Sequence, residues 1–116
     1  MGIPIGRRNT PETDLVRAIL QLLRLRGIYA WRNNTTGVYD PVKGVFRKFT
    51  GLKGVSDVLG VLPDGRFLAI EAKAPKGRSS PEQQTFIDDI NGWGGLAFLA
   101  RSLADVDEAL RREGYL

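Results

Sequence analysis

The sequence predicts an α/β domain with a mixed central β-sheet flanked by helices. Apolar residues recur at helical spacing near both ends of the chain, and short apolar runs bounded by glycine and proline lie between them. The predicted order is helix, four strands, helix, strand, helix, which is typical of this class. Because 116 residues supply one hydrophobic core but not two, we expect a single domain at residues 10–116, preceded by a basic arm at residues 1–9.

The predicted first helix begins with a capping signal. Thr10 suits the N-cap, Pro11 the first helical position and Glu12 the first turn. Gly27 suits the residue that ends the helix. The apolar stripe that faces the core then comprises Leu15, Val16, Ile19, Leu22 and Leu23.

Two further helices are predicted in the second half of the chain. One begins at Ser80-Pro81-Glu82-Gln83, which has the pattern of a capping box, and ends near Gly92. The other spans residues 102–112 and places three apolar residues on one face, Leu103, Val106 and Leu110.

The predicted strands span residues 28–32, 45–49, 58–62, 67–72 and 95–100. The stretch at residues 45–49 is basic and follows a glycine, so it forms either a short exposed strand or a flap. The aromatic residues in this region, Tyr39, Phe46 and Phe49, would stack on nucleic-acid bases or pack the flap down, and we expect packing for most of them.

The composition excludes several kinds of catalysis. The chain has no cysteine and no histidine, which excludes disulfides, thiolate zinc sites and imidazole bases. Any chemistry must therefore rely on carboxylates, amines or hydroxyls. No apolar run approaches the roughly 18–20 residues that span a bilayer, and the N-terminus has no signal-peptide pattern. We therefore expect a cytoplasmic protein.

Positive charge is concentrated in the first half of the chain. Residues 1–54 contain 10 Lys/Arg and 3 Asp/Glu, a net charge of +7, whereas residues 55–116 contain 7 and 10, a net charge of −3. This division suits a polyanion-binding surface beside a site that needs carboxylates, and a solvated basic surface explains it equally well. The candidate phosphate contacts are Arg7, Arg8, Arg32, Lys43, Arg47, Lys48, Lys53, Lys76 and Arg78.

A hairpin joins two of the predicted strands through Pro63-Asp64-Gly65. This pattern is typical of a three-residue loop closed by glycine in the left-handed conformation. Such a loop pairs Leu62 with Arg66. Continuing the antiparallel register toward the other end of the hairpin places Asp57 opposite Glu71. A two-residue loop would shift the register by one and move Asp57 to the other face.

Asp57 and Glu71 predict a metal site. Opposed residues share a face and lie about 5 Å apart at Cβ, and Lys73 is two residues beyond Glu71 on that face. Two carboxylates so close repel unless a hard cation such as Mg²⁺ or Mn²⁺ binds between them. Such an ion activates water for phosphodiester hydrolysis, and Lys73 would orient that water or stabilise charge on the phosphate. Spacing alone equally supports a polar strand end with a solvent-facing Glu71–Lys73 pair.

Asp64 belongs to a misleading motif. Together with the preceding proline and with Glu71-Ala72-Lys73, it reads P-D-x6-E-x-K. However, Asp64 lies at the tip of the hairpin, and Glu71 lies roughly 23 Å away at about 3.3 Å per residue. Asp64 is therefore expected to be a turn residue and not a metal ligand.

The order of these residues resembles the PD-(D/E)XK nuclease superfamily: a helix with Glu12, then Asp57 and Glu71-Ala72-Lys73, then a helix with Gln83. More narrowly, the run from Gly54 to Phe86, with S-P-E-Q-Q-x-F after the triplet, resembles the VRR-NUC family over nearly the whole chain. The resemblance implies a restriction-endonuclease-like fold and hydrolysis of DNA that depends on Mg²⁺ or Mn²⁺. Similarity to stand-alone members from phages and bacteria implies a homodimer that acts on branched DNA such as Holliday junctions.

The resemblance also implies roles for individual residues. Asp57 and Glu71 match the metal ligands, with the Ala72 carbonyl as a third oxygen, and Lys73 matches the catalytic lysine. Ser56 stands where the motif of the superfamily has proline, which supplies no ligand.

Two residues on helices match supporting positions. Glu12 would hold a metal-bound water or a second ion, or it would serve only the helix dipole. Gln83 would support the site near Lys73, or it would serve only the capping box. The sequence thus favours a structure-selective endonuclease. A nuclease for flaps, nicked or single-stranded DNA and a non-catalytic nucleic-acid-binding module remain as alternatives.

Overall fold

The computed structural model describes residues 10–33, 38–47 and 51–115, without the side chains of residues 38, 39, 46 and 47. The expected basic arm at residues 1–9 lies outside this part of the chain. So do the predicted contacts Arg7, Arg8 and Lys48 and the side chains of Tyr39, Phe46, Arg47 and Phe49. Within the described residues, no helix is long and apolar enough to cross a membrane.

The described residues form three helices and six strands. In chain order these are α1 (Pro11–Leu25), β1 (Tyr29–Arg32), β2 (Val38–Asp40), β3 (Val45–Arg47), β4 (Val58–Val61), β5 (Phe67–Ala72), α2 (Pro81–Gly92), β6 (Leu96–Ala100) and α3 (Leu103–Arg112).

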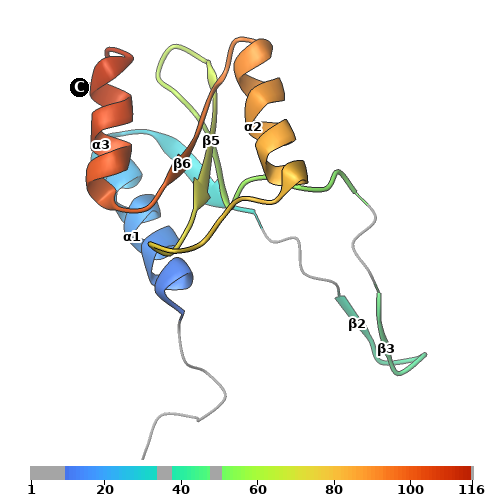
Figure 1. Ribbon diagram of the computed structural model, residues 1–116. Helices are drawn as coiled ribbons and strands as arrows, with labels where there is room; N and C mark the ends of the chain where they lie inside the picture. Colours follow the sequence, from blue (N-terminus) through green and yellow to red (C-terminus); the bar gives the residue numbers. More distant parts are fainter. Residues whose placement is uncertain (1–9, 34–37, 48–50, 116) are drawn as a thin grey trace, which may run out of the picture.

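Four strands form the central sheet in the order β1-β4-β5-β6. Strand β4 is antiparallel to both β1 and β5, whereas β5 and β6 are parallel, so the sheet is mixed. Helices α1 and α3 cover one face and α2 the other (Figure 1). The predicted α/β class with a mixed central sheet is therefore confirmed.

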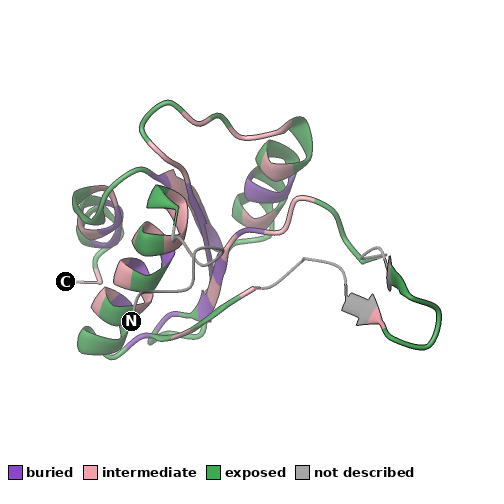
Figure 2. Ribbon diagram, turned by 90° about the horizontal axis from the view of Figure 1, so that it is seen from below, coloured by how far each residue is buried: buried purple, intermediate pink, exposed green. Residues whose placement is uncertain are grey.

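Alternate residues of β5 face two separate apolar clusters. Leu68 and Ile70 pack with buried residues of α1 and α3. Ala69 packs on the other face with Phe86 and Ile87 of α2. Figure 2 shows the buried sheet between the helices. A polar side chain on β5 is therefore removed from water whichever face it points to.

The helix boundaries follow the predicted caps, with one correction on the apolar faces. Thr10 Oγ1 accepts a hydrogen bond from the backbone N–H of Thr13 at 3.0 Å and caps α1. In α3, Val106 and Leu110 are buried as predicted, but Leu103 is 40% exposed. Leu103 is the first residue of α3, so it lies at the end of the helix, where its side chain is only partly covered.

The basic stretch between β1 and β4 contains two strands, whereas one was predicted, at residues 45–49. Strands β2 and β3 form an antiparallel hairpin of their own. The Asp40 carboxylate accepts hydrogen bonds from the N–H groups of Val42 and Lys43 at 2.9 and 3.2 Å, and Gly44 has a φ of 66°. This hairpin stands apart from the central sheet (Figure 1). Strand β2 was missed because turn chemistry, and not apolar alternation, defines it.

The β4–β5 hairpin has the predicted register. Val58 pairs with Ile70, and at the turn the N–H of Leu62 donates to the carbonyl of Arg66 at 2.8 Å. Gly65 has a φ of 93°, the left-handed conformation that closes a three-residue loop. The turn therefore determines which residues meet at the other end of the hairpin.

Candidate active site

The hairpin register brings Asp57 and Glu71 together at the end of the sheet away from the turn. Asp57 directly precedes β4, and its carbonyl accepts a hydrogen bond from the N–H of Asn33 at 2.8 Å, which extends the pairing with β1. The Oδ2 atom of Asp57 accepts a hydrogen bond from the N–H of Ala72 at 2.9 Å. The Asp57 carboxylate is thus held against the strand that carries Glu71.

Glu71 is a carboxylate in the interior of the sheet, only 2% exposed. Its Oε2 atom lies 3.6 Å from Lys73 Nζ and accepts a hydrogen bond from Gln83 Nε2 at 3.0 Å. Its Oε1 atom is buried and has no hydrogen-bond partner among the described residues. The Lys73 side chain is only 12% exposed, so the alternative of a solvent-facing Glu71–Lys73 pair is wrong.

The surroundings of Glu71 raise its pKa. Burial raises the pKa of Glu71 to about 8, and the charge of the nearby Asp57 acts in the same direction. Lys73 lowers the pKa of Glu71 without offsetting these effects. Near neutral pH the pair therefore favours binding a proton or a cation.

Gln83 combines the two roles that its position suggested. Its Oε1 atom accepts a hydrogen bond from the N–H of Ser80 at 2.8 Å, and Ser80 Oγ accepts one from the N–H of Gln83 at 3.1 Å, which completes the capping box. The capping box directs the amide so that its other end, Nε2, donates to Glu71. The start of α2 therefore holds one oxygen of the buried carboxylate.

Gly54 allows the segment before β4 to approach the start of α2. It has a φ of 80°, and a Cβ atom placed there would lie 2.3 Å from the carbonyl oxygen of Glu82. Any other residue would therefore move the segment that carries Asp57 away from the helix that carries Gln83. The sequence places a glycine three residues before Asp57 but does not itself reveal this contact.

Two residues from distant elements hold the loop between β5 and α2. Glu12 Oε2, from the first turn of α1, accepts a hydrogen bond from the N–H of Ala74 at 3.3 Å. Arg101 directly follows β6, and its Nη1 atom donates hydrogen bonds to the carbonyls of Ala74 and Gly77 at 2.8 and 2.7 Å. Sequence reasoning selected Glu12 but missed Arg101, because no local motif marks an arginine that binds carbonyls of a remote loop.

The predicted phosphate contacts are not gathered at one point. Arg32 ends β1 beside Asn33, and Lys76 and Arg78 lie on the loop that follows Lys73. Lys53 lines a cavity of about 350 Å³ beside α2, and Lys43 lies on the turn of the separate β2–β3 hairpin. All five of these basic residues, Arg32, Lys43, Lys53, Lys76 and Arg78, are exposed.

The donor set fits a hard divalent cation. The carboxylates of Asp57 and Glu71 would supply oxygen ligands. The raised pKa of Glu71, and its oxygen without a partner among the described residues, show that Lys73 alone does not compensate the burial of this carboxylate. Within the described ranges, no group of three or more acidic side chains surrounds such a position, so Glu12 does not complete a three-carboxylate cluster. Remaining ligands would have to come from the Ala72 carbonyl, water or a phosphate oxygen.

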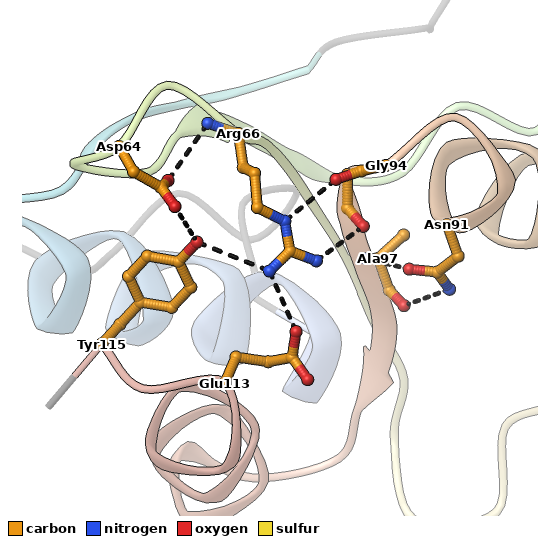
Figure 3. Close-up of polar contacts among 8 residues, drawn as sticks. Asp64, Arg66, Asn91, Gly94, Ala97, Glu113 and Tyr115 are labelled. Carbon is orange, nitrogen blue, oxygen red and sulfur yellow. Dashed lines mark hydrogen bonds and ion pairs between the residues drawn. The ribbon is translucent and has the colours of Figure 1, made fainter.

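Asp64 lies at the opposite end of the hairpin in a separate network (Figure 3). Its carboxylate accepts hydrogen bonds from Tyr115 Oη at 2.8 Å and from the N–H of Arg66 at 3.2 Å. The guanidinium of Arg66 in turn binds Glu113 at 3.0 Å and the carbonyl of Gly94 at 2.9 Å. The expectation that Asp64 is a turn residue is confirmed.

Comparisons with known proteins agree with this architecture. The family model of the VRR-NUC domain matches residues 10–104. A solved structure described as a VRR_NUC domain protein superposes with a TM-score of 0.56 at 14% identity, covering 91% of this chain and 89% of that chain. At this identity the likeness concerns the fold alone. No curated protein matches the chain.

Proposed function

The chain belongs to the VRR-NUC domain family, and we propose that it is a structure-selective DNA endonuclease that depends on Mg²⁺ or Mn²⁺. One observation carries the proposal: the buried carboxylate of Glu71, beside Asp57 and Lys73, has an oxygen without a hydrogen-bond partner in the described structure. A buried charge is normally paired or coordinates a metal. Membership of a nuclease family makes phosphodiester hydrolysis the chemistry that best fits such a site.

Each residue at the site has a distinct task in this proposal. Asp57 and Glu71 would hold the ion, which when bound supplies Lewis-acid activation of water and phosphate. Gln83 holds Oε2 of Glu71 and leaves Oε1 for the ion. The ammonium of Lys73 would stabilise the negative charge that grows on the phosphate during attack.

Residues farther from the carboxylates would position the substrate. Glu12 holds the N–H of Ala74, directly after Lys73, and so supports the geometry of the lysine. The exposed Lys76 and Arg78 on the same loop would bind phosphates near the cut. DNA bound to Lys76 and Arg78 would thus be held by the same loop that Glu12 fixes next to Lys73.

We further propose branched DNA, such as a four-way junction, as the substrate and a two-fold homodimer as the active form. The basic residues on several separate segments support a substrate that extends beyond one duplex end. Symmetric cutting of a junction requires two sites related by a two-fold axis. A monomer by light scattering, unchanged on adding junction DNA, would contradict this part of the proposal.

The test is a cleavage assay on four-way junction, flap, nicked duplex, linear duplex and single-stranded DNA, with and without Mg²⁺ or Mn²⁺. We expect metal-dependent cutting that is fastest on the junction. Glu71→Ala and Lys73→Ala should abolish cutting but leave binding largely in place, whereas Glu82→Gln, an exposed carboxylate on α2, serves as the matched control.

The outcomes separate the alternatives. Preference for flaps, nicks or single strands would retain the mechanism and replace the substrate. Binding without cleavage of any substrate in either metal would overturn the enzymatic proposal in favour of a binding module. Binding should also weaken steeply with salt, because counterions released from DNA drive it.

A further inference from the structure

Two aromatic side chains are exposed on the edge strand β1. Tyr29 is 74% exposed and Trp31 is 40% exposed, although both lie in a strand of the central sheet. Their ring centroids lie 5.6 Å apart, and the rings are tilted by 53°, so they contact each other without stacking face to face. Aromatic rings of this size are usually covered unless a partner binds them.

The register places these rings on the same face of the sheet as the candidate active site. Trp31 pairs with Leu59, and the hydrogen bond from Asn33 to the carbonyl of Asp57 continues this pairing by two residues. Because opposed residues share a face and alternate residues return to it, Trp31, Leu59 and Asp57 lie on one face. Trp31 is thus a diagonal neighbour of Asp57 across the antiparallel pair, a position at which residues lie about 7–8 Å apart.

This half of the face is not covered by a helix within the described structure. Helix α2 packs on β5 and β6, where Ala69, Phe86 and Ile87 are buried. The cover by α2 does not extend to β1: Val61 on β4, which pairs with Tyr29, is 37% exposed. The result is an aromatic strip along the edge strand β1, from Trp31, diagonal to Asp57, to Tyr29.

We propose that Tyr29 and Trp31 form a stacking platform for an unpaired nucleobase of the DNA strand held at the Asp57–Glu71 site. The charge of this half of the chain favours a nucleic acid over a protein partner, because residues 1–54 carry a net charge of +7. Arg32, the exposed residue after Trp31, lies on the same edge strand but pairs with Val58 on the other face. Base–aromatic stacking beside basic residues is the usual way in which proteins bind single strands.

The proposal rests on the proposed nuclease function and narrows its substrate. In an intact duplex the faces of the bases are covered by their neighbours, so only an unpaired or splayed nucleotide offers a free face. The substrate therefore has an unpaired nucleotide close to the cut, as at a branch point, a flap or a single-stranded end.

The two tryptophans of the chain allow a direct test. Trp93 is 91% exposed at the C-cap of α2, remote from β1, so Trp93→Phe leaves Trp31 as the sole tryptophan and Trp31→Phe leaves Trp93. Each variant is titrated with short single-stranded oligothymidylate and with a blunt duplex of equal length, in chelator so that nothing is cut. We expect single strands to quench Trp31 fluorescence saturably, with no such change for Trp93 or with the duplex.

Affinity for labelled oligothymidylate measures what the platform contributes. Trp31→Ala should weaken binding roughly ten-fold or more, and Trp31→Phe much less because a ring remains. Equal quenching of both tryptophans, or unchanged affinity of Trp31→Ala, would overturn the platform. Loss of a dimer in Trp31→Ala by light scattering would instead assign the strip to an interface between two copies and also overturn it.

The two proposals fail independently. Quenching of Trp31 without metal-dependent cleavage would retain the platform and refute the nuclease. Cleavage without quenching would retain the nuclease and refute the platform.

Discussion

Each end of the β4–β5 hairpin has a carboxyl group, but the pKa is lowered at one end and raised at the other. At the turn, both oxygens of Asp64 accept hydrogen bonds, and the bond from Tyr115 lowers the pKa of Asp64 below its usual value. At the other end, Glu71 has a buried oxygen that no described residue pairs with, and burial raises its pKa to about 8. The part of the chain that the structure describes thus supplies hydrogen-bond partners for both oxygens of Asp64 but for only one oxygen of Glu71.

This difference distinguishes a carboxylate that serves the fold from one that fits the proposed metal site. The Arg66 network connects the hairpin turn, the turn after α2 and the segment after α3, so it joins three parts of the chain that are far apart in sequence (Figure 3). The Asp57–Glu71 pair instead stores unfavourable electrostatic energy that a bound cation would relieve. The motif alone does not distinguish Asp64 from Glu71, since both belong to P-D-x6-E-x-K.

The largest expected effect comes from removing the charge at the site. Glu71→Gln should reduce metal-dependent cleavage on the order of a thousand-fold, because a metal ligand contributes several kcal/mol to the transition state. The same change should leave thermal stability about equal below pH 8, where Glu71 keeps its proton, and raise it above pH 8, where it removes a buried charge repelled by Asp57. Asp64→Asn, the same chemical change at the turn, should leave cleavage unchanged. Equal loss of cleavage in both variants would refute the distinction.

The second effect is on the pH dependence of stability without metal. Between about pH 4.5 and pH 8 the unfolded chain has an ionised Glu71, whereas the folded protein keeps its proton. The folded state binds more protons, so stability falls as pH rises through this window, by up to about 1.4 kcal/mol per pH unit, and levels off above it. Urea denaturation across this range measures the slope.

Two comparisons assign that slope to Glu71. Glu71→Gln should flatten it, because the amide does not titrate. Mg²⁺ or Mn²⁺ should restore stability at the upper end of the window, since the ion binds the ionised carboxylates. A slope that persists in Glu71→Gln would show that another group causes it.

The third effect concerns the turn. Arg66→Met removes hydrogen bonds to the Gly94 and Gly95 carbonyls and to Glu113, and should lower the free energy of unfolding by about 1–2 kcal/mol. The cleavage rate below the melting range should not change. Arg111→Met, which removes an exposed pair with Asp107, is the control and should cost only a few tenths of a kcal/mol. A large loss of cleavage in Arg66→Met would show that the two ends are coupled.

The smallest effect separates the two roles of Gln83. Gln83→Ala removes both the capping box and the bond to Glu71, and should weaken metal binding about ten-fold or more. Ser80→Ala disturbs only the cap and should cost about 1 kcal/mol of stability with little change in metal affinity. Calorimetric titration with Mn²⁺ compares them. Equal metal affinities in the two variants would assign Gln83 to the helix alone.

Local signals account for the parts of the fold that sequence predicted well. The caps at Thr10 and Ser80 act within a single turn, so they can be recognised from a few neighbouring residues. The loop from Pro63 to Gly65 sets its own backbone conformation, and the register follows from it by counting along the strands. The opposition of Asp57 and Glu71 was therefore predictable without any tertiary information.

Long-range contacts account for what was missed. Nothing near Arg101 indicates that it binds the loop after β5, and nothing near Gly54 indicates the approach of Glu82. Strand β2 was overlooked because its three residues are too few to show an alternation of apolar and polar residues, and the last of them, Asp40, belongs to the turn.

The sequence by itself determined the order of the elements other than β2, the register of the hairpin and the residues that share its polar face, because turns, caps and alternation depend on neighbours along the chain. Only the tertiary structure decided that Glu71 is buried, that Gln83 reaches it and that Tyr29 and Trp31 are left uncovered. Burial depends on which helices cover which half of a sheet, and that depends on packing between segments far apart in sequence.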